Sequence, residues 1–159
     1  MPHLIIEHSS NIKKSAIHSL EKEIQNIMAA IVEGNFDPDQ CKARSHSFDE
    51  YLVGKPDQTT SSFLHITIKI LSGRTLEVRK KLAEKVMNFS KNFFEKLEFT
   101  PTPKDQIMAT ANQIADVVSG VPHVQMPMRH ADLSDKRCDI SVDIVEMDRE
   151  VYQKIRIEN

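Results

Sequence analysis

Apolar and polar residues alternate in short segments of this chain, a pattern typical of β-strands. The segments at 3–7 and 43–51 fit it less regularly, and residues 140–147 fit it well. The clearest segment is 63–70, whose even positions are all apolar: Leu64, Ile66, Ile68 and Ile70. The odd positions that follow Phe63 carry polar groups: His65, Thr67 and Lys69. Four strands are therefore expected.

Apolar residues at helical spacing separate these segments. The first stripe runs from Ile17 to Ile31 and predicts a helix that ends at Gly34, as a C-terminal glycine would end it. The second helix follows Thr75, a suitable N-cap, and has an apolar stripe. That stripe is Val78, Leu82, Val86, Phe89, Phe93 and Leu97. A further short helix is expected from Thr102-Pro103 to Gly120.

The two halves of the chain have similar patterns of apolar residues. A shift of 62 residues places Leu4 on Ile66 and Leu20 on Leu82, so strand and helix stripe stay in register together. We interpret this as a duplicated β-α-β unit, at 2–51 and at 63–148, within a single domain spanning 1–159. The second unit carries an insertion at about 98–137.

This order predicts an α+β fold: a four-stranded mixed sheet with two helices on one face, plus a partly helical insertion. The other face of the sheet would then be bare. Neither face of the third strand is strongly charged, so we expect the bare face to be covered by oligomerisation, or in part by the insertion.

Composition narrows the classes of function. The chain has 159 residues, 40% hydrophobic and 28% charged, with a formal net charge of -2, which gives no electrostatic footprint for nucleic acid. No apolar stretch approaches the roughly 20 residues of a membrane helix, and no signal peptide is recognisable. The two cysteines, Cys41 and Cys138, are therefore expected to be free thiols in the cytoplasm.

Four segments together carry a family resemblance: MPHLIIE at the start, ARSHSFDEY at 43–51, HITIKILSGRTLEVRKKL at 65–82 and ISVDIVEMD at 140–148. They resemble the 5-carboxymethyl-2-hydroxymuconate isomerase family of the tautomerase superfamily, which also includes 4-oxalocrotonate tautomerase and macrophage migration inhibitory factor. The resemblance covers about three-quarters of the chain and leaves out residues 98–137.

The resemblance implies a homotrimer that uses no cofactor and converts enols or dienols to conjugated ketones. Such enzymes move a proton between carbon and oxygen, here in a small anionic di- or tricarboxylate, and the resemblance places them in aromatic catabolism. Two alternatives stay open. One is that the chain uses the same proline in a hydration or dehalogenation, and the other is that it is a non-catalytic trimeric module on the same fold.

Pro2 is the candidate general base. A chain-initial proline has a secondary amine, and removal of methionine is favoured before so small a residue. Partial desolvation and nearby cations would lower the pKa of this amine enough for it to act near pH 7. If Met1 stays attached, the nitrogen is an amide and cannot act as a base. The alternative is that Pro2 only precedes a strand and has no chemical role.

Three cations complete the predicted site. Arg74, between a strand end and a helix N-terminus, matches the family's substrate-binding arginine and could hold a carboxylate bidentately. Arg44 matches a second family arginine, whereas Lys42 stands where the family usually has another. Lysine lacks the two-pronged donor, so recognition of a second carboxylate by Lys42 is in doubt. The alternatives are an exposed turn arginine for Arg74 and solvated strand-edge charges for Arg44 and Lys42.

No metal site is expected. His123, His130, Asp132 and Cys138 have spacings that match no standard zinc pattern. His3, His46 and His65 lie on predicted strands near the proposed site, where each could donate to a substrate oxygen or serve only the structure.

Overall fold

The computed structural model describes residues 1–54, 61–96 and 138–152. Its strands are β1 (His3–Ser9), β2 (Lys42–Phe48), β3 (Ser62–Leu71) and β4 (Cys138–Met147). Its helices are α1 (Lys14–Ala29) and α2 (Leu76–Phe94), with two short 3-10 turns, η1 (Val32–Gly34) and η2 (Pro38–Gln40), between α1 and β2. The helix expected at 102–120, with most of the insertion, lies outside the described residues.

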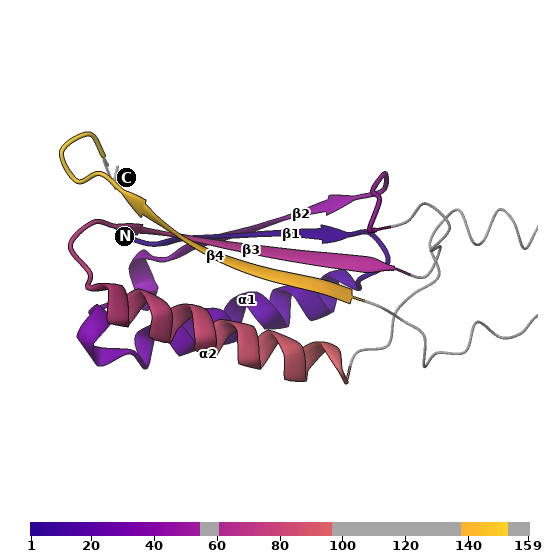
Figure 1. Ribbon diagram of the computed structural model, residues 1–159, viewed down its shortest axis with the longest axis horizontal. Helices are drawn as coiled ribbons and strands as arrows, with labels where there is room; N and C mark the ends of the chain where they lie inside the picture. The colour runs from indigo at the N-terminus through magenta and orange to yellow at the C-terminus, as the bar shows by residue number, and fades with distance from the viewer. Residues whose placement is uncertain (55–60, 97–137, 153–159) are drawn as a thin grey trace, which may run out of the picture.

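The four strands form one mixed sheet in the order β2-β1-β3-β4. The central pair, β1 and β3, is antiparallel, and each central strand has a parallel outer partner. Both helices lie against the same face of the sheet (Figure 1). The α+β class, the four-stranded mixed sheet and the two helices on one face are thereby confirmed.

The core lies between this sheet face and the helices. Leu4 is opposite Ile68 and Ile6 opposite Ile66, and all four side chains are fully buried. α1 contributes Ile17, Leu20 and Ile24 to the same cluster. The two helices begin 62 residues apart, at Lys14 and Leu76, so the internal repeat seen in the sequence is present in the backbone.

The end of α1 differs from the prediction. The helix ends at Ala29, not at Gly34, because the backbone leaves the helical conformation at Ile31, whose side chain is buried in the core. Gly34 belongs to η1, and the left-handed residue that follows is Asn35, with φ 45°. The glycine is required for a different reason: a Cβ at Gly34 would overlap the ring of Phe36.

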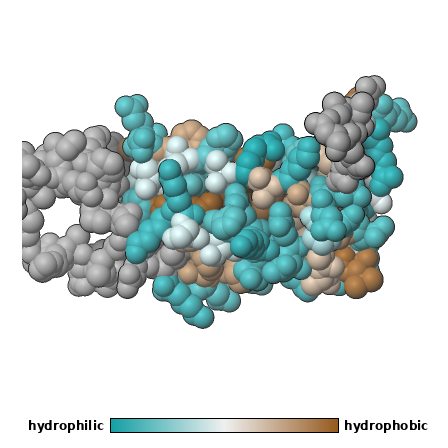
Figure 2. All heavy atoms as spheres, turned by 180° about the vertical axis from the view of Figure 1, so that it is seen from behind, coloured by the Kyte–Doolittle hydropathy of each residue, from teal (hydrophilic) through white to brown (hydrophobic). Residues whose placement is uncertain are grey.

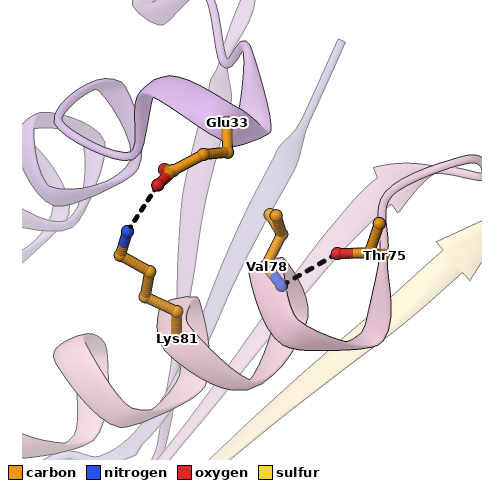
Figure 3. A network of polar contacts seen from close by, with 4 residues as sticks. All are labelled: Glu33, Thr75, Val78 and Lys81. Carbon is orange, nitrogen blue, oxygen red and sulfur yellow. Dashed lines mark hydrogen bonds and ion pairs between the residues drawn. The ribbon is translucent and has the colours of Figure 1, made fainter.

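The start of α2 agrees with the prediction. The Thr75 hydroxyl accepts a hydrogen bond from the Val78 amide at 3.3 Å, a cap of the kind that contributes about 1 kcal/mol (Figure 3). One turn further along, Lys81 binds the Glu33 carboxylate at 2.9 Å and connects α2 to η1. The buried stripe continues through Ser90 and Phe94, whereas Phe89 and Phe93, which were assigned to it, are only half-buried.

The other sheet face is covered by no described helix (Figure 1). It is more polar than β3 alone suggested, because the register places Arg44 and Asp143 in the same cross-strand row as Ile5 and Thr67. Viewed from behind, the described surface is largely hydrophilic, with small scattered hydrophobic areas (Figure 2). Neither helix of the described segments is long and apolar enough to cross a membrane.

Candidate active site

One end of the sheet collects the predicted site residues. Because β1 and β2 are parallel and β3 is antiparallel to β1, β1 and β2 begin where β3 ends. His3 stands opposite both Lys42 and Lys69. β4 ends there as well, and Figure 1 shows the N-terminus beside the end of β4. Residues from both halves of the chain therefore surround the N-terminus.

Pro2 is buried at this end of the sheet. Its carbonyl oxygen accepts a hydrogen bond from the backbone N–H of Lys42 at 3.1 Å, so the first residues are fixed to the neighbouring strand. With Met1 attached, the Pro2 nitrogen is a tertiary amide without a basic lone pair. The arrangement holds this nitrogen at a defined point, and its chemistry depends on Met1.

His3 carries the titratable side chain nearest to that nitrogen in sequence. Burial lowers the pKa of His3 below its ordinary value of 6.5, and the positive charges of Arg44, Lys42, the terminal amine and Lys69 lower that pKa further. These cations therefore act together on the start of β1. Lys42 and Arg44 therefore lower the pKa of His3, the residue after Pro2, while their role at Pro2 itself stays a prediction.

Tyr152, which follows β4, lies at the same end of the sheet. Its hydroxyl oxygen lies 3.0 Å from His3 Nε2, and the two rings meet edge to face with centroids 6.0 Å apart. The hydroxyl also donates to the Met1 sulfur at 3.7 Å. The segment after β4 thus packs directly against the N-terminus.

Arg74 follows β3, but its described hydrogen bonds go to backbone carbonyls of residues other than Pro2 and His3. Its Nε donates to the Gly34 carbonyl at 3.1 Å, and its Nη1 donates to the Leu71 carbonyl at 2.9 Å. Burial lowers the pKa of Arg74, and the positive charge of Arg149 lowers that pKa further. Within the described part of the chain, no hydrogen bond joins Arg74 to Pro2 or His3.

Arg149 is a second guanidinium at the junction between β3 and α2. Its Nε donates to the Ser72 carbonyl at 2.6 Å, and its guanidinium passes close to Gly73, which has φ 101°. Two arginines are thus oriented by backbone carbonyls beside the N-terminus of α2, where the helix dipole favours anions.

Sequence reasoning missed three residues of this region: Lys69, Tyr152 and Arg149. Lys69 could have been found, because its alternation with Thr67 puts it on the uncovered face and the antiparallel pairing puts it opposite His3. Tyr152 and Arg149 follow the last strand without any recognisable motif. Tyr152 depends on a contact with His3, 149 residues away, and Arg149 depends on a contact with Ser72, 77 residues away.

The opposite end of the sheet has a different character. A hollow of about 290 Å³ opens there. It is lined by Leu52, Val53, Gly54, Phe63, Leu64, Asp139, Ile140 and Ser141. No group of three metal-ligating side chains occurs within the described ranges, and His123, His130 and Asp132 lie outside them.

Known proteins resemble this chain in sequence and in fold. The family model of 5-carboxymethyl-2-hydroxymuconate isomerase matches residues 2–104. The 5-carboxymethyl-2-hydroxymuconate Delta-isomerase of Escherichia coli is 32% identical over 98 residues, which cover 61% of this chain and 75% of that protein.

Solved structures extend the fold match beyond residue 104. A 5-carboxymethyl-2-hydroxymuconate isomerase from Deinococcus radiodurans R1 superposes with a TM-score of 0.68 at 17% identity, covering 98% of this chain and 90% of that one. A symmetric trimer of fused 4-OT gives 0.50 at 12% identity, covering 92% and 86%. At these identities the structures establish the fold alone. The match over residues 2–104 establishes more: the chain belongs to the 5-carboxymethyl-2-hydroxymuconate isomerase family.

Proposed function

We propose that the chain, once Met1 has been removed, is a cofactor-independent tautomerase in which the Pro2 amine moves a proton within an enol or dienol carboxylate. The observation that carries this proposal is the burial of Pro2 at a sheet end where Lys42, Arg44 and Lys69 all act on the adjacent His3. Burial and neighbouring cations both disfavour a protonated amine. The same environment would therefore lower the pKa of the prolyl amine.

The mechanism needs two proton transfers and no net change in charge. The prolyl nitrogen takes the proton of the enol O–H, which leaves a dienolate on the substrate. The resulting prolyl ammonium then gives that proton to the far carbon of the conjugated system, while the oxygen forms the carbonyl bond. Fixed cations stabilise the dienolate charge in between.

Substrate binding follows from the same charges. Lys42 and Arg44 are exposed at the end of the sheet next to Pro2, and they would attract the carboxylates of a small dianionic substrate. Arg74 would hold one carboxylate through the donors that Gly34 and Leu71 leave unused. The place of the reaction is proposed to be the cytoplasm, in keeping with the free thiols of Cys41 and Cys138.

A homotrimer is proposed as the working form. The sheet face opposite the helices, which no described helix covers, supports this, because a half-covered sheet gains stability from a partner. Within one chain Arg74 shares no described hydrogen bond with Pro2. In a trimer Arg74 of one subunit could reach the Pro2 of another.

The test combines mass spectrometry with kinetics. The mass of the purified protein gives the fraction without Met1, and ketonisation of 2-hydroxymuconate is followed by absorbance. We expect Pro2→Ala to lower kcat/KM by about 10² to 10⁴-fold, the range for a lost general base. Quantitative retention of Met1, or equal rates for wild type and Pro2→Ala, would refute the proposal.

A further inference from the structure

The group to which the Tyr152 hydroxyl donates its hydrogen bond can be assigned from its two contacts. It lies within hydrogen-bonding distance of two groups, His3 Nε2 at 3.0 Å and the Met1 sulfur at 3.7 Å. A thioether has no hydrogen to give, so it can only accept. Because the phenol has one hydrogen, both contacts are hydrogen bonds together only when that hydrogen points at the sulfur and His3 donates its Nε2–H to the phenolic oxygen. We assign this tautomer from the hydrogen-bond pattern.

Three further contacts fix this hydroxyl before any ligand binds. The Tyr152 amide donates to the Asp148 carbonyl at 3.1 Å, and the Glu150 amide donates to the Asp148 carboxylate at 2.9 Å, so residues 148–152 form a tight turn after β4. The ring then packs edge to face on His3. Donors that are aligned in advance stabilise developing charge best, because they need not reorganise during the reaction.

The position of the Met1 sulfur indicates that the Tyr152 hydroxyl would contact a bound substrate. Met1 is bonded to the nitrogen of Pro2, so its side chain occupies space within one residue of that atom. A substrate whose proton is taken by the prolyl amine must enter the same space. Loss of Met1 also removes the group to which Tyr152 donates.

We propose that Tyr152 donates its hydroxyl hydrogen bond to the enol or enolate oxygen of the substrate, with His3 as the residue that positions it. This inference rests on the proposed function. When Pro2 takes the enol proton, the negative charge develops on that oxygen, and Tyr152 O–H shares its hydrogen with it without transferring a proton. The low pKa of His3 is consistent with the role, because a neutral imidazole adds no positive charge beside the amine.

The assignment defines a ligand class: a dicarboxylate with a 2-oxo or 2-hydroxy group, in preference to a plain dicarboxylate. Binding measurements can test this without turnover. We expect Met1-free protein to bind 2-oxoadipate about 3- to 10-fold more tightly than adipate, the effect of one neutral hydrogen bond. In Tyr152→Phe, which keeps the ring on His3, the two dissociation constants should become equal.

The chain offers a matched control, because its other tyrosine, Tyr51, donates to Ser61 at the opposite end of the sheet. Tyr51→Phe should keep the preference for 2-oxoadipate. Absence of the preference in wild type, or its persistence in Tyr152→Phe, overturns the inference. If Tyr152→Phe removes the preference that wild type shows, but wild type does not turn over 2-hydroxymuconate, the proposed function fails and only the hydrogen bond from Tyr152 to the 2-oxygen of a ligand stands.

Kinetic measurements on variants distinguish the role of Tyr152 from that of His3. Tyr152→Phe should lower kcat for 2-hydroxymuconate by about 10- to 100-fold with KM within about 3-fold, since the bond strengthens as charge develops. His3→Leu should show the same fall in kcat, and His3→Gln, which restores an N–H donor near the Nε2 position, should recover most of it. A kcat of Tyr152→Phe within twofold of wild type, or equal losses in both His3 variants, would refute the respective role.

Discussion

The guanidinium of Arg74 lies over the ring of Phe36, with 4.9 Å between its central carbon and the ring centroid. Gly34 contacts both members of this pair, because its carbonyl accepts from Arg74 Nε and its missing side chain leaves room for the ring. The first β-α-β unit therefore sets the position of an arginine that belongs to the second.

This stack predicts the effect of a methyl group at Gly34. In Gly34→Ala the new Cβ would overlap the Phe36 ring, and the ring is too buried to move freely. We expect a loss of about 1–3 kcal/mol in the free energy of unfolding, as for other overpacked sites, measured by urea denaturation. The double variant Gly34→Ala with Phe36→Leu should recover part of the loss. Additive losses in the double variant would show that the overlap is not the cause.

Arg74 gives a second prediction, about binding rather than stability. Arg74→Ala should raise KM for 2-hydroxymuconate by about tenfold or more, since it removes a charge-assisted bidentate partner for a carboxylate. Arg74→Lys should recover little, because a lysine lacks the planar fork. An unchanged KM in Arg74→Ala would restrict this side chain to its structural contacts with Gly34, Leu71 and Phe36.

Mixed assemblies can locate the partner of Arg74. If Arg74 serves the Pro2 of another subunit, co-expressed Pro2→Ala and Arg74→Ala chains should form some sites with both residues intact. We expect such mixtures to regain activity that neither variant has alone. A mixture no more active than its components would place both residues of each site in one chain.

His3 predicts a pH dependence of stability. Its pKa is lower in the folded protein than the ordinary 6.5, so the unfolded chain binds a proton first as the pH falls. His3 should therefore favour unfolding increasingly from about pH 6.5 downward, with no such effect above pH 8. His3→Gln should flatten this part of the profile, measured as the urea midpoint between pH 8 and pH 5. An unchanged slope would contradict the buried, cation-flanked environment of His3.

The two thiols should react slowly in the native protein. Burial raises the pKa of Cys138 to about 12, with a smaller contribution from Asp139, and burial also raises the pKa of Cys41. Because the thiolate is the reactive form, iodoacetamide at pH 7 should label both far more slowly than it labels the urea-unfolded chain. Cys41→Ser and Cys138→Ser would assign the rates individually. Native rates equal to unfolded rates would show that these thiols are not shielded.

Much of the fold could be predicted because strong periodicity determines burial. The even positions of β3 are buried as their alternation indicates, and Thr75 caps α2 as its hydroxyl and position suggest. The ends of elements were less predictable. Gly34 was assigned to a helix end from residue type, but its role is set by the Phe36 ring, a tertiary contact that sequence periodicity does not report.

The candidate site was predictable only where strand pairing creates it. Lys42 and Arg44 lie beside the first residues of β1, opposite His3 and Ile5, because β1 and β2 are parallel neighbours, which the β-α-β order implies. Tyr152 and Arg149 depend on the turn after β4, and no pattern in the chain marks it. The segment at 140–148, part of the family resemblance, also lies beyond the family match that ends at residue 104.

The repeat has one consequence for chemistry. In the 62-residue register Pro2 corresponds to Leu64, which lies inside the chain at the start of β3. An internal residue never gains a free amine, so a fused second copy of the unit cannot supply a second prolyl base. Where that base would have stood, the sheet has a hollow whose lining, in the described part of the chain, is mainly apolar and includes no cation. Under the proposed function, only one end of the sheet can therefore hold a prolyl base, and proton transfer places no constraint on the residues at the other end.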